Sequence, residues 1–168
     1  MFDVGEYVMS STNGICKVSD RVQMDVSGEK KSYFLLIPTE EEHAKIYVPV
    51  ENADKRIRKV LSRAQAMEVI NHIGITKQLE ITNEKEREKC YKEAIRSGDP
   101  LLLVEIIKNM YTRRQERMAE GKKITAVDER YFKIAVHHLH GELAFALGCD
   151  EEEVEQLICN QLEPAATE

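Results

Sequence analysis

Histidine and acidic side chains are the first residues of this chain to consider for chemistry. His137, His138 and His140 lie within four positions, and His137 and His140 would share one face of a helix. Two imidazoles make an incomplete metal site, and no Cys, Asp or Glu completes a recognisable ligand spacing around them. We therefore predict a structural or surface role for these histidines, without a metal or any other cofactor.

The cysteines show no pattern of a reactive or metal-binding set. The four lie far apart, at Cys16, Cys90, Cys149 and Cys159, and form no C-x-x-C pair. Scattered thiols favour reduced cysteines in a cytosolic compartment. The sequence contains no glycine-rich phosphate loop, nucleophile elbow, signal peptide or long apolar run. We expect a cytoplasmic protein that is not an enzyme, with no small-molecule substrate and no membrane partner.

Charge is distributed unevenly along the 168 residues, whose net charge is −6. Residues 1–51 contain 5 Lys/Arg and 9 Asp/Glu, residues 52–133 contain 19 and 13, and residues 134–168 contain 0 and 8. A basic middle section in an acidic protein predicts a surface for a polyanion, and the acidic end would limit indiscriminate binding.

The first 52 residues predict a small β-domain. β-Branched and aromatic residues gather there in short runs, at 7–9, 15–18, 22–26, 33–37 and 46–48. Asn13-Gly14 and Ser27-Gly28 between these runs tolerate the positive φ of tight turns. Four or five short strands indicate a strongly bent antiparallel sheet. An open edge of such a sheet can accept a strand from a partner.

After residue 52 the apolar spacing becomes helical. Helices are predicted over 63–73, from 82 to 96, from 100 to about 118, from 125 to 147 and from 150 to about 162. The predicted class is α+β: a β-domain at 1–52, a junction at 53–62, a bundle of about five helices at 63–163 and a tail at 164–168.

Five motifs then follow one another in a distinctive order. They are Val4-Gly5-Glu6, Val48-Pro49-Val50-Glu51-Asn52-Ala53, Ser97-Gly98-Asp99, Arg113-Arg114-Gln115-Glu116-Arg117 and Gly141-Glu142-Leu143-Ala144. In this order the chain resembles, over nearly its whole length, the CarD/CdnL family of bacterial transcription regulators. The resemblance implies a Tudor-like RNA polymerase-interacting domain, shared with the transcription-repair coupling factor, that pairs a sheet edge with a strand of the polymerase β subunit. It also implies a helical domain that contacts promoter DNA near the upstream edge of the −10 element, so that the protein stabilises or modulates the open complex.

One position departs from the family pattern. Family members commonly carry a tryptophan wedge where this chain has Glu84, and the chain contains no tryptophan. A carboxylate repels phosphate and cannot insert an apolar surface between stacked bases. We therefore expect a divergent member that lacks the apolar wedge.

Candidate interface residues follow for both domains. On the β-domain we predict a polymerase contact through Tyr33, Lys45 and Tyr47. On the helical domain the predicted DNA contacts are basic side chains that would meet the backbone of double-stranded promoter DNA: Lys85, Arg87, Lys89, Arg114 and Arg130. Lys85 and Lys89 are i,i+4 neighbours on one helix face, and the resemblance places Arg87, Lys89 and Arg130 at DNA-facing positions.

An alternative stays open for the helical domain. Glutamates at 84, 86, 88 and 93 alternate with the cations, which is also typical of a solvated helix with i,i+4 ion pairs. The chain could then be an adaptor that docks on the polymerase and binds another protein instead of DNA. Charge reversal at Lys85, Arg87 and Lys89 separates the two hypotheses.

Overall fold

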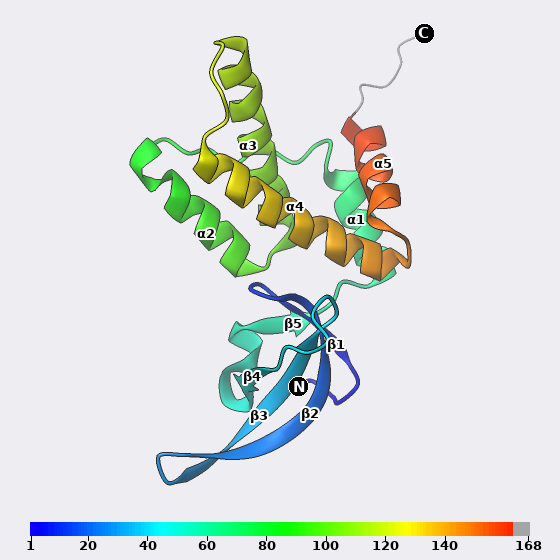
Figure 1. Cartoon of the computed structure of the whole chain (residues 1–168). Helices are drawn as coiled ribbons and strands as arrows, with labels where there is room; N and C mark the ends of the chain where they lie inside the picture. The colour runs from blue at the N-terminus through cyan, green and yellow to red at the C-terminus, as the bar shows by residue number, and fades with distance from the viewer. Residues whose placement is uncertain (163–168) are drawn as a thin grey trace. The chain divides into compact units, whose positions relative to one another are not determined.

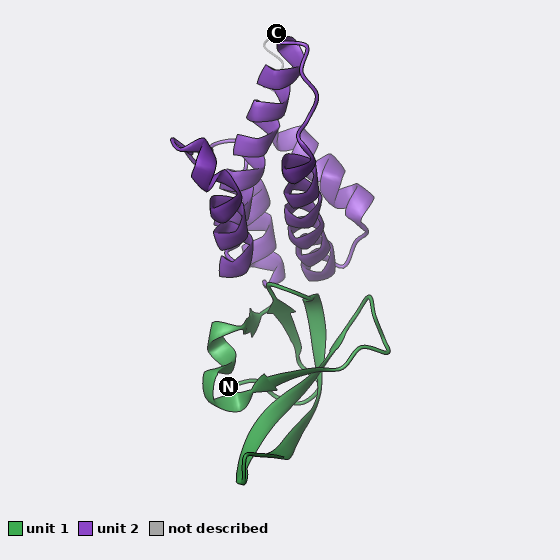
Figure 2. Ribbon diagram, turned by 60° about the vertical axis from the view of Figure 1, so that its left-hand side comes forward, with its two compact units in different colours: residues 1–60 green, residues 61–168 purple. Residues whose placement is uncertain are grey.

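A computed structural model describes residues 1–162, so the predicted tail at 164–168 lies outside the described residues. The chain divides into two compact units, one of residues 1–60 and one that begins at Leu61 (Figure 2). We call them the β-unit and the helical unit. The predicted α+β class is confirmed: an antiparallel sheet comes first and helices follow.

The β-unit is a five-stranded antiparallel sheet in the order β4-β3-β2-β1-β5 (Figure 1). Its strands are β1 (Tyr7–Ser10), β2 (Gly14–Val26), β3 (Glu29–Pro38), β4 (Ile46–Pro49) and β5 (Ile57–Lys59). The short 3-10 helix η1 (Val50–Lys55) connects β4 to β5. The two runs at 15–18 and 22–26, which the sequence separates, form one long strand. A register shift between Val18 and Asp20 adds one residue there, and such a bulge increases bending and twist.

The segment 53–62, predicted to be a junction, contains β5. Its three residues pair with β1 in the register Val8↔Lys59, Met9↔Arg58 and Ser10↔Ile57. Ile57 is buried and joins the apolar core of the β-unit. The sheet therefore needs residues beyond the expected domain end.

Side-chain alternation divides the sheet into a core face and an outer face. Phe34 lies opposite Val48, and Val18 lies opposite Leu36; all four are buried in the core of the β-unit. Cys16 is also fully buried there, and burial raises the pKa of its thiol to about 11. This thiol stays protonated at neutral pH and behaves as a small apolar side chain.

The helical unit contains α1 (Arg63–His72), η2 (Glu84–Glu86), α2 (Arg87–Ser97), α3 (Pro100–Ala119), α4 (Ala126–Leu147) and α5 (Glu151–Leu162). The predicted starts are confirmed by side-chain caps. Asp99 accepts a hydrogen bond from Leu101 N at 3.0 Å, and Thr125 accepts one from Asp128 N at 3.1 Å. The helix predicted from residue 82 begins with the 3-10 turn η2. The Asn83 side chain caps this turn, because its Oδ1 accepts a hydrogen bond from Lys85 N at 3.1 Å.

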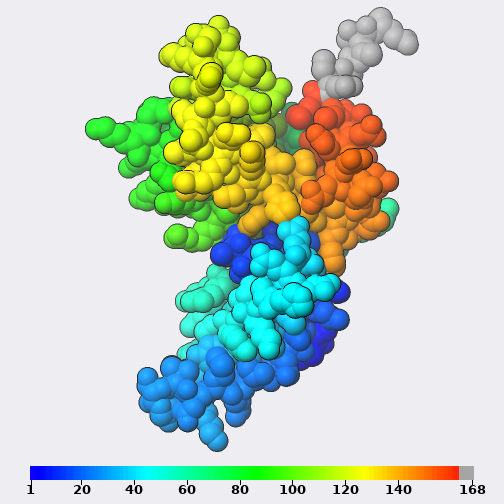
Figure 3. Space-filling model, viewed as in Figure 1, coloured from blue at the N-terminus to red at the C-terminus, as the bar shows by residue number. Residues whose placement is uncertain are grey.

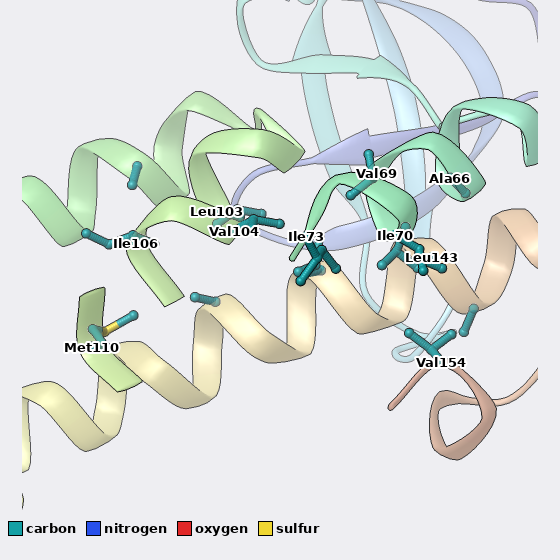
Figure 4. Close-up of a cluster of buried hydrophobic side chains, with 14 of the residues drawn as sticks. Ala66, Val69, Ile70, Ile73, Leu103, Val104, Ile106, Met110, Leu143 and Val154 are labelled. Atoms are coloured by element: carbon teal, nitrogen blue, oxygen red, sulfur yellow. The ribbon is translucent and has the colours of Figure 1, made fainter. Parts of the chain in front are cut away.

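One apolar core fills the helical unit (Figure 4). It includes Ile70 of α1, Ile106 of α3, Leu143 of α4 and Val154 of α5, all at most 1% exposed. Gly74 follows α1 and lies close to α5: a β-carbon there would lie 2.8 Å from the Gln161 carbonyl oxygen. None of the helices within residues 1–162 is long and apolar enough to cross a membrane.

Candidate interfaces of the two units

The first candidate interface is the free edge of β4. The strand order ends at β4, so one side of its backbone has no neighbouring strand within the described sheet. Tyr47 projects to the outer face and is 41% exposed. Tyr33 lies one strand in, opposite Pro49, while Leu35 is opposite Tyr47. The two tyrosines are therefore diagonal neighbours on one face.

Lys45 lies at the other end of the same edge. It directly precedes β4 and is exposed, whereas Tyr33 lies beside the C-terminal end of this strand. Lys45 and Tyr47 thus lie on this short edge, and Tyr33 of β3 lies beside its far end. Unpaired backbone N–H and C=O groups can accept a strand, and the flanking side chains would select which one.

The second candidate interface rests on a closed ring of five polar side chains from η2, α2, α3 and α4. The Arg87 guanidinium donates through Nε and Nη2 to the two Glu84 oxygens, both at 2.9 Å. It also donates to the Tyr91 hydroxyl at 2.9 Å, which donates to Asp128 Oδ1 at 2.8 Å. Arg113 closes the ring, because it donates to Asp128 Oδ2 at 2.8 Å and to Glu84 Oε2 at 2.9 Å.

Most of this ring is removed from water. Arg87 is 9% exposed, Tyr91 0% and Asp128 6%. Burial opposes the charged form of Asp128, but the hydrogen bonds from Arg113, Tyr91 and the Thr125 hydroxyl outweigh it, so the pKa of Asp128 lies below its ordinary value. Burial raises the pKa of Tyr91 to about 12, which keeps its hydroxyl a donor. Among residues 1–162 no buried side-chain N or O atom is unpaired.

Arg87 and Glu84 therefore do not project freely into solvent, as residues of a surface helix would. The Arg87 guanidinium faces inward, where it also donates to Asn109 Oδ1 at 2.9 Å. Glu84 is held by two arginines, and the hydrogen bond from Arg87 is the main reason that its pKa is lowered. These two residues are held within the ring, while neighbouring cations are exposed.

Lys85 and Lys89 are exposed cations close to Glu84 and Arg87 in the sequence, and both face solvent. Lys85 lies in η2, is exposed and makes no ion pair with another residue of the described chain. The Lys89 side chain is 72% exposed, and its Nζ lies 4.0 Å from Glu93 Oε1, at the limit of an ion pair. Exposed pairs of this kind contribute little, so both ammonium groups are accessible to another anion.

Arg130 of α4 is linked to α2 by a hydrogen bond to Glu88. Arg130 Nη2 donates to Glu88 Oε1 at 3.1 Å, and its guanidinium lies 4.8 Å from the Tyr131 ring centroid. The side chain is still 59% exposed. We call Lys85, Lys89 and Arg130 the η2–α2 surface.

Arg114 lies apart from the η2–α2 surface. It is exposed on α3 and lines a cavity of about 260 Å³ together with Met110, Phe132 and Lys133. The end of α3 and the following loop, coloured yellow-green, are at the surface in Figure 3.

The histidines lie on α4. The His137 and His138 rings are 6.5 Å apart. His140 is partly buried, and burial lowers its pKa despite the nearby Glu155 and Glu151. This favours the neutral imidazole at physiological pH.

Sequence reasoning missed three members of the ring: Tyr91, Arg113 and Asp128. The spacing of Glu84, Arg87 and Tyr91 by three and four residues was a usable signal, since such residues share a helix face. The partners from α3 and α4 had no local signal. Arg113 lies in a sequence rich in arginine, and Asp128 lies in the first turn of a helix, so neither shows its partner locally.

Two domain matches cover most of the chain. Residues 2–61 match the CarD-like/TRCF RID domain, and residues 65–159 match the CarD C-terminal domain. A β-unit followed by a helical unit of these two kinds defines an RNA polymerase-interacting transcription factor. The chain belongs to the CarD family, as its motifs predicted, and this is a family of transcription factors and not of enzymes.

Proposed function

We propose that this protein binds the β subunit of RNA polymerase through the β4 edge and contacts promoter DNA near the upstream edge of the −10 region through its helical unit. Bound in this way, it stabilises or modulates the open promoter complex in the bacterial cytoplasm. The observation that carries the proposal is the pair of domain matches, in chain order, over residues 2–61 and 65–159.

The polymerase contact is assigned to the β4 edge because it combines open backbone with exposed side chains. Main-chain pairing supplies affinity in strand addition, and side chains on alternate positions set the fit. Tyr33, Lys45 and Tyr47 lie along this edge, and Tyr47 is the most central of them.

The DNA contact is assigned to the η2–α2 surface, with Arg114 as an extension. Its cations are exposed: Lys85 makes no ion pair within the described residues, and those of Lys89 and Arg130 are exposed to solvent, which suits contacts with successive phosphates. Arg87 is buried in the ring through Nη1, so it could meet DNA only through the Nε and Nη2 donors that face Glu84. Binding of this kind depends steeply on salt and little on base sequence.

The test is the lifetime of open complexes formed by bacterial RNA polymerase on a promoter, with full-length protein. We expect the change in lifetime to be lost when Tyr47→Ala weakens docking, and also when Lys85→Glu and Lys89→Glu are combined. If the double charge reversal leaves the lifetime unchanged while docking is intact, the DNA contact is wrong.

One observation favours the adaptor as a second candidate. A groove of about 670 Å³ in the helical unit is lined by apolar side chains that include Val69, Ile75 and Leu101. Ile75 is 77% and Leu101 47% exposed, which suits a protein partner. The adaptor predicts that Leu101→Glu abolishes the effect on open complexes, whereas charge reversal at Lys85 and Lys89 does not.

A further inference from the structure

Glu84 occupies a place between two arginines that an external anion could fill. Its two oxygens accept three hydrogen bonds, two from Arg87 and one from Arg113. The Glu84 side chain is nevertheless 61% exposed, while those of Arg87 and Arg113 are 11% and 22% exposed. The carboxylate is thus the outer partner and the two guanidinium groups are the inner ones.

Both guanidinium groups are fixed from behind, independently of Glu84. Arg87 Nη1 donates to the Tyr91 hydroxyl and to Asn109 Oδ1, each at 2.9 Å. Arg113 Nε donates to Asp128 Oδ2 at 2.8 Å. The donors directed at Glu84 would therefore keep their positions if its carboxylate moved away. Planar, preoriented guanidinium donors bind phosphate as well as carboxylate. We call this pair of arginines the Arg87–Arg113 fork.

The fork itself has the charge for one phosphate, and a cavity beside it has the room. The fork borders a cavity of about 370 Å³ that Asn109 and Thr112 also line. Without Glu84 the ring holds two arginines and the single carboxylate of Asp128, a net charge of +1 that matches one phosphodiester. Glu80 and Glu116 also line the cavity, and their charge opposes any anion there, di- and triphosphates more than a single phosphodiester.

We propose that Glu84 is a built-in competitor for a DNA phosphate. In the free protein it fills the Arg87–Arg113 fork, and a backbone phosphodiester of the promoter displaces it. This inference rests on the proposed function, because it requires the helical unit to meet DNA. Binding then exchanges one set of charge-assisted hydrogen bonds for another, which keeps the DNA affinity low.

The test is Glu84→Gln, which removes the competing charge and retains an oxygen that can accept from Arg87. We expect full-length Glu84→Gln to bind a promoter duplex about tenfold more tightly, with a log–log salt slope steeper by about 0.9, because no displaced carboxylate then takes up a cation in place of the one that the phosphate releases. Fluorescence anisotropy over a salt series measures both quantities.

Glu86→Gln is the matched control. It removes the same charge from the same turn, and Glu86 makes no ion pair within the part of the chain that is described. We expect a gain of about twofold at most, from reduced long-range repulsion. Equal gains for the two variants would overturn the proposal.

Inorganic phosphate separates a DNA phosphate from a free anion as the ligand. When sodium phosphate replaces chloride at constant ionic strength, we expect it to compete with the duplex on Glu84→Gln more strongly than on Glu86→Gln. The proposal is wrong if phosphate competes equally on both variants. It is also wrong if phosphate raises the melting temperature of Glu84→Gln while its duplex affinity matches that of the control, because the fork would then bind only the free anion.

The double variant with Lys85→Glu and Lys89→Glu distinguishes this proposal from the proposed function. If that variant binds the duplex as the unmodified protein does, the DNA contact itself fails. If it binds weakly and Glu84→Gln behaves like Glu86→Gln, the DNA contact holds and only the competitor role of Glu84 fails.

Discussion

The β4 edge and the η2–α2 surface offer a partner opposite kinds of chemistry. The edge presents main-chain N–H and C=O groups beside two tyrosines, and Lys45 is the charged member of the three predicted residues. The η2–α2 surface presents three cations above a ring whose inner members are buried. The first proposed interface would depend on strand geometry and the second on charge, which salt screens.

This difference teaches that one chain can carry two proposed contacts that respond differently to salt. Each contact lies in a unit with its own apolar core. A substitution in one unit should therefore leave the other contact intact, as expected for sites that share no partners. The following experiments test that separation.

The largest expected effect comes from opening the ring. Arg87→Ala removes the donor shared by Glu84, Tyr91 and Asn109, and breaking a buried charge network typically costs about 3–5 kcal/mol. We expect the melting temperature of the helical unit to fall strongly in circular dichroism, with binding to the polymerase retained. Arg114→Ala, at an exposed position on α3, is the control and should change stability by about 0.5 kcal/mol or less. Equal melting temperatures for the two variants would show that the ring is not a foundation of this surface.

A smaller effect is expected at the other interface. Tyr47→Ala removes the central side chain of the β4 edge, and we expect polymerase binding to weaken by about 2 kcal/mol, roughly 30-fold. Titration of the full-length protein against polymerase measures it, and the loss should persist at high salt. Tyr111→Ala, an exposed tyrosine on α3, is the matched control. A parallel loss of duplex affinity in Tyr47→Ala would contradict the separation of the two contacts.

Charge reversal on the η2–α2 surface should have a more modest effect that depends on salt. We expect Lys85→Glu combined with Lys89→Glu to weaken duplex binding about tenfold at low salt and to lower the log–log slope by about 2. Lys30→Glu with Lys31→Glu makes the same total charge change on β3 and serves as the control. If both pairs weaken binding equally, net charge and not a defined surface controls DNA binding.

The smallest expected effect is a dependence of stability on acid. The pKa values of Asp128 and Glu84 lie below their ordinary values of 3.8 and 4.5. Their charged forms therefore stabilise the folded helical unit above those ordinary values, and this stabilisation is lost as the pH falls through the lowered ones. We expect thermal stability to decline below about pH 4. Asp128→Asn should be less stable at neutral pH and show a flatter decline, and a decline as steep as that of the unmodified protein would exclude Asp128 as its source.

Local signals in the sequence predicted most of the helical unit. Asp99 before Pro100, and Thr125 three residues before Asp128, mark helix starts through contacts within one turn. Such short-range chemistry can be read directly from a sequence. The 3-10 turn η2 was not foreseen, because Asn83 caps the second following residue and the regular helix starts only at Arg87.

Features that depend on distant partners could not be predicted. The basic tripeptide Ile57-Arg58-Lys59 resembles a linker, and only its pairing with β1 makes it a strand. Arg87 has the type and spacing of a surface cation. It is buried because Tyr91, Asn109 and Glu84 satisfy its donors, and Asn109 comes from another helix 22 residues later. The physical reason in both cases is a contact that no local pattern records.

At Gly74 the chain has a position where a hydrogen atom fits and a methyl group does not. The carbonyl oxygen of Gln161 lies 2.8 Å from the position that a β-carbon would take, which is too close. Because this oxygen belongs to the backbone, it cannot rotate aside as the end of a flexible side chain can. Even alanine would therefore force the final helix outward and loosen Val154 from its apolar neighbours. Attachment of the C-terminal segment thus depends on the smallest amino acid, located almost ninety positions earlier in the chain.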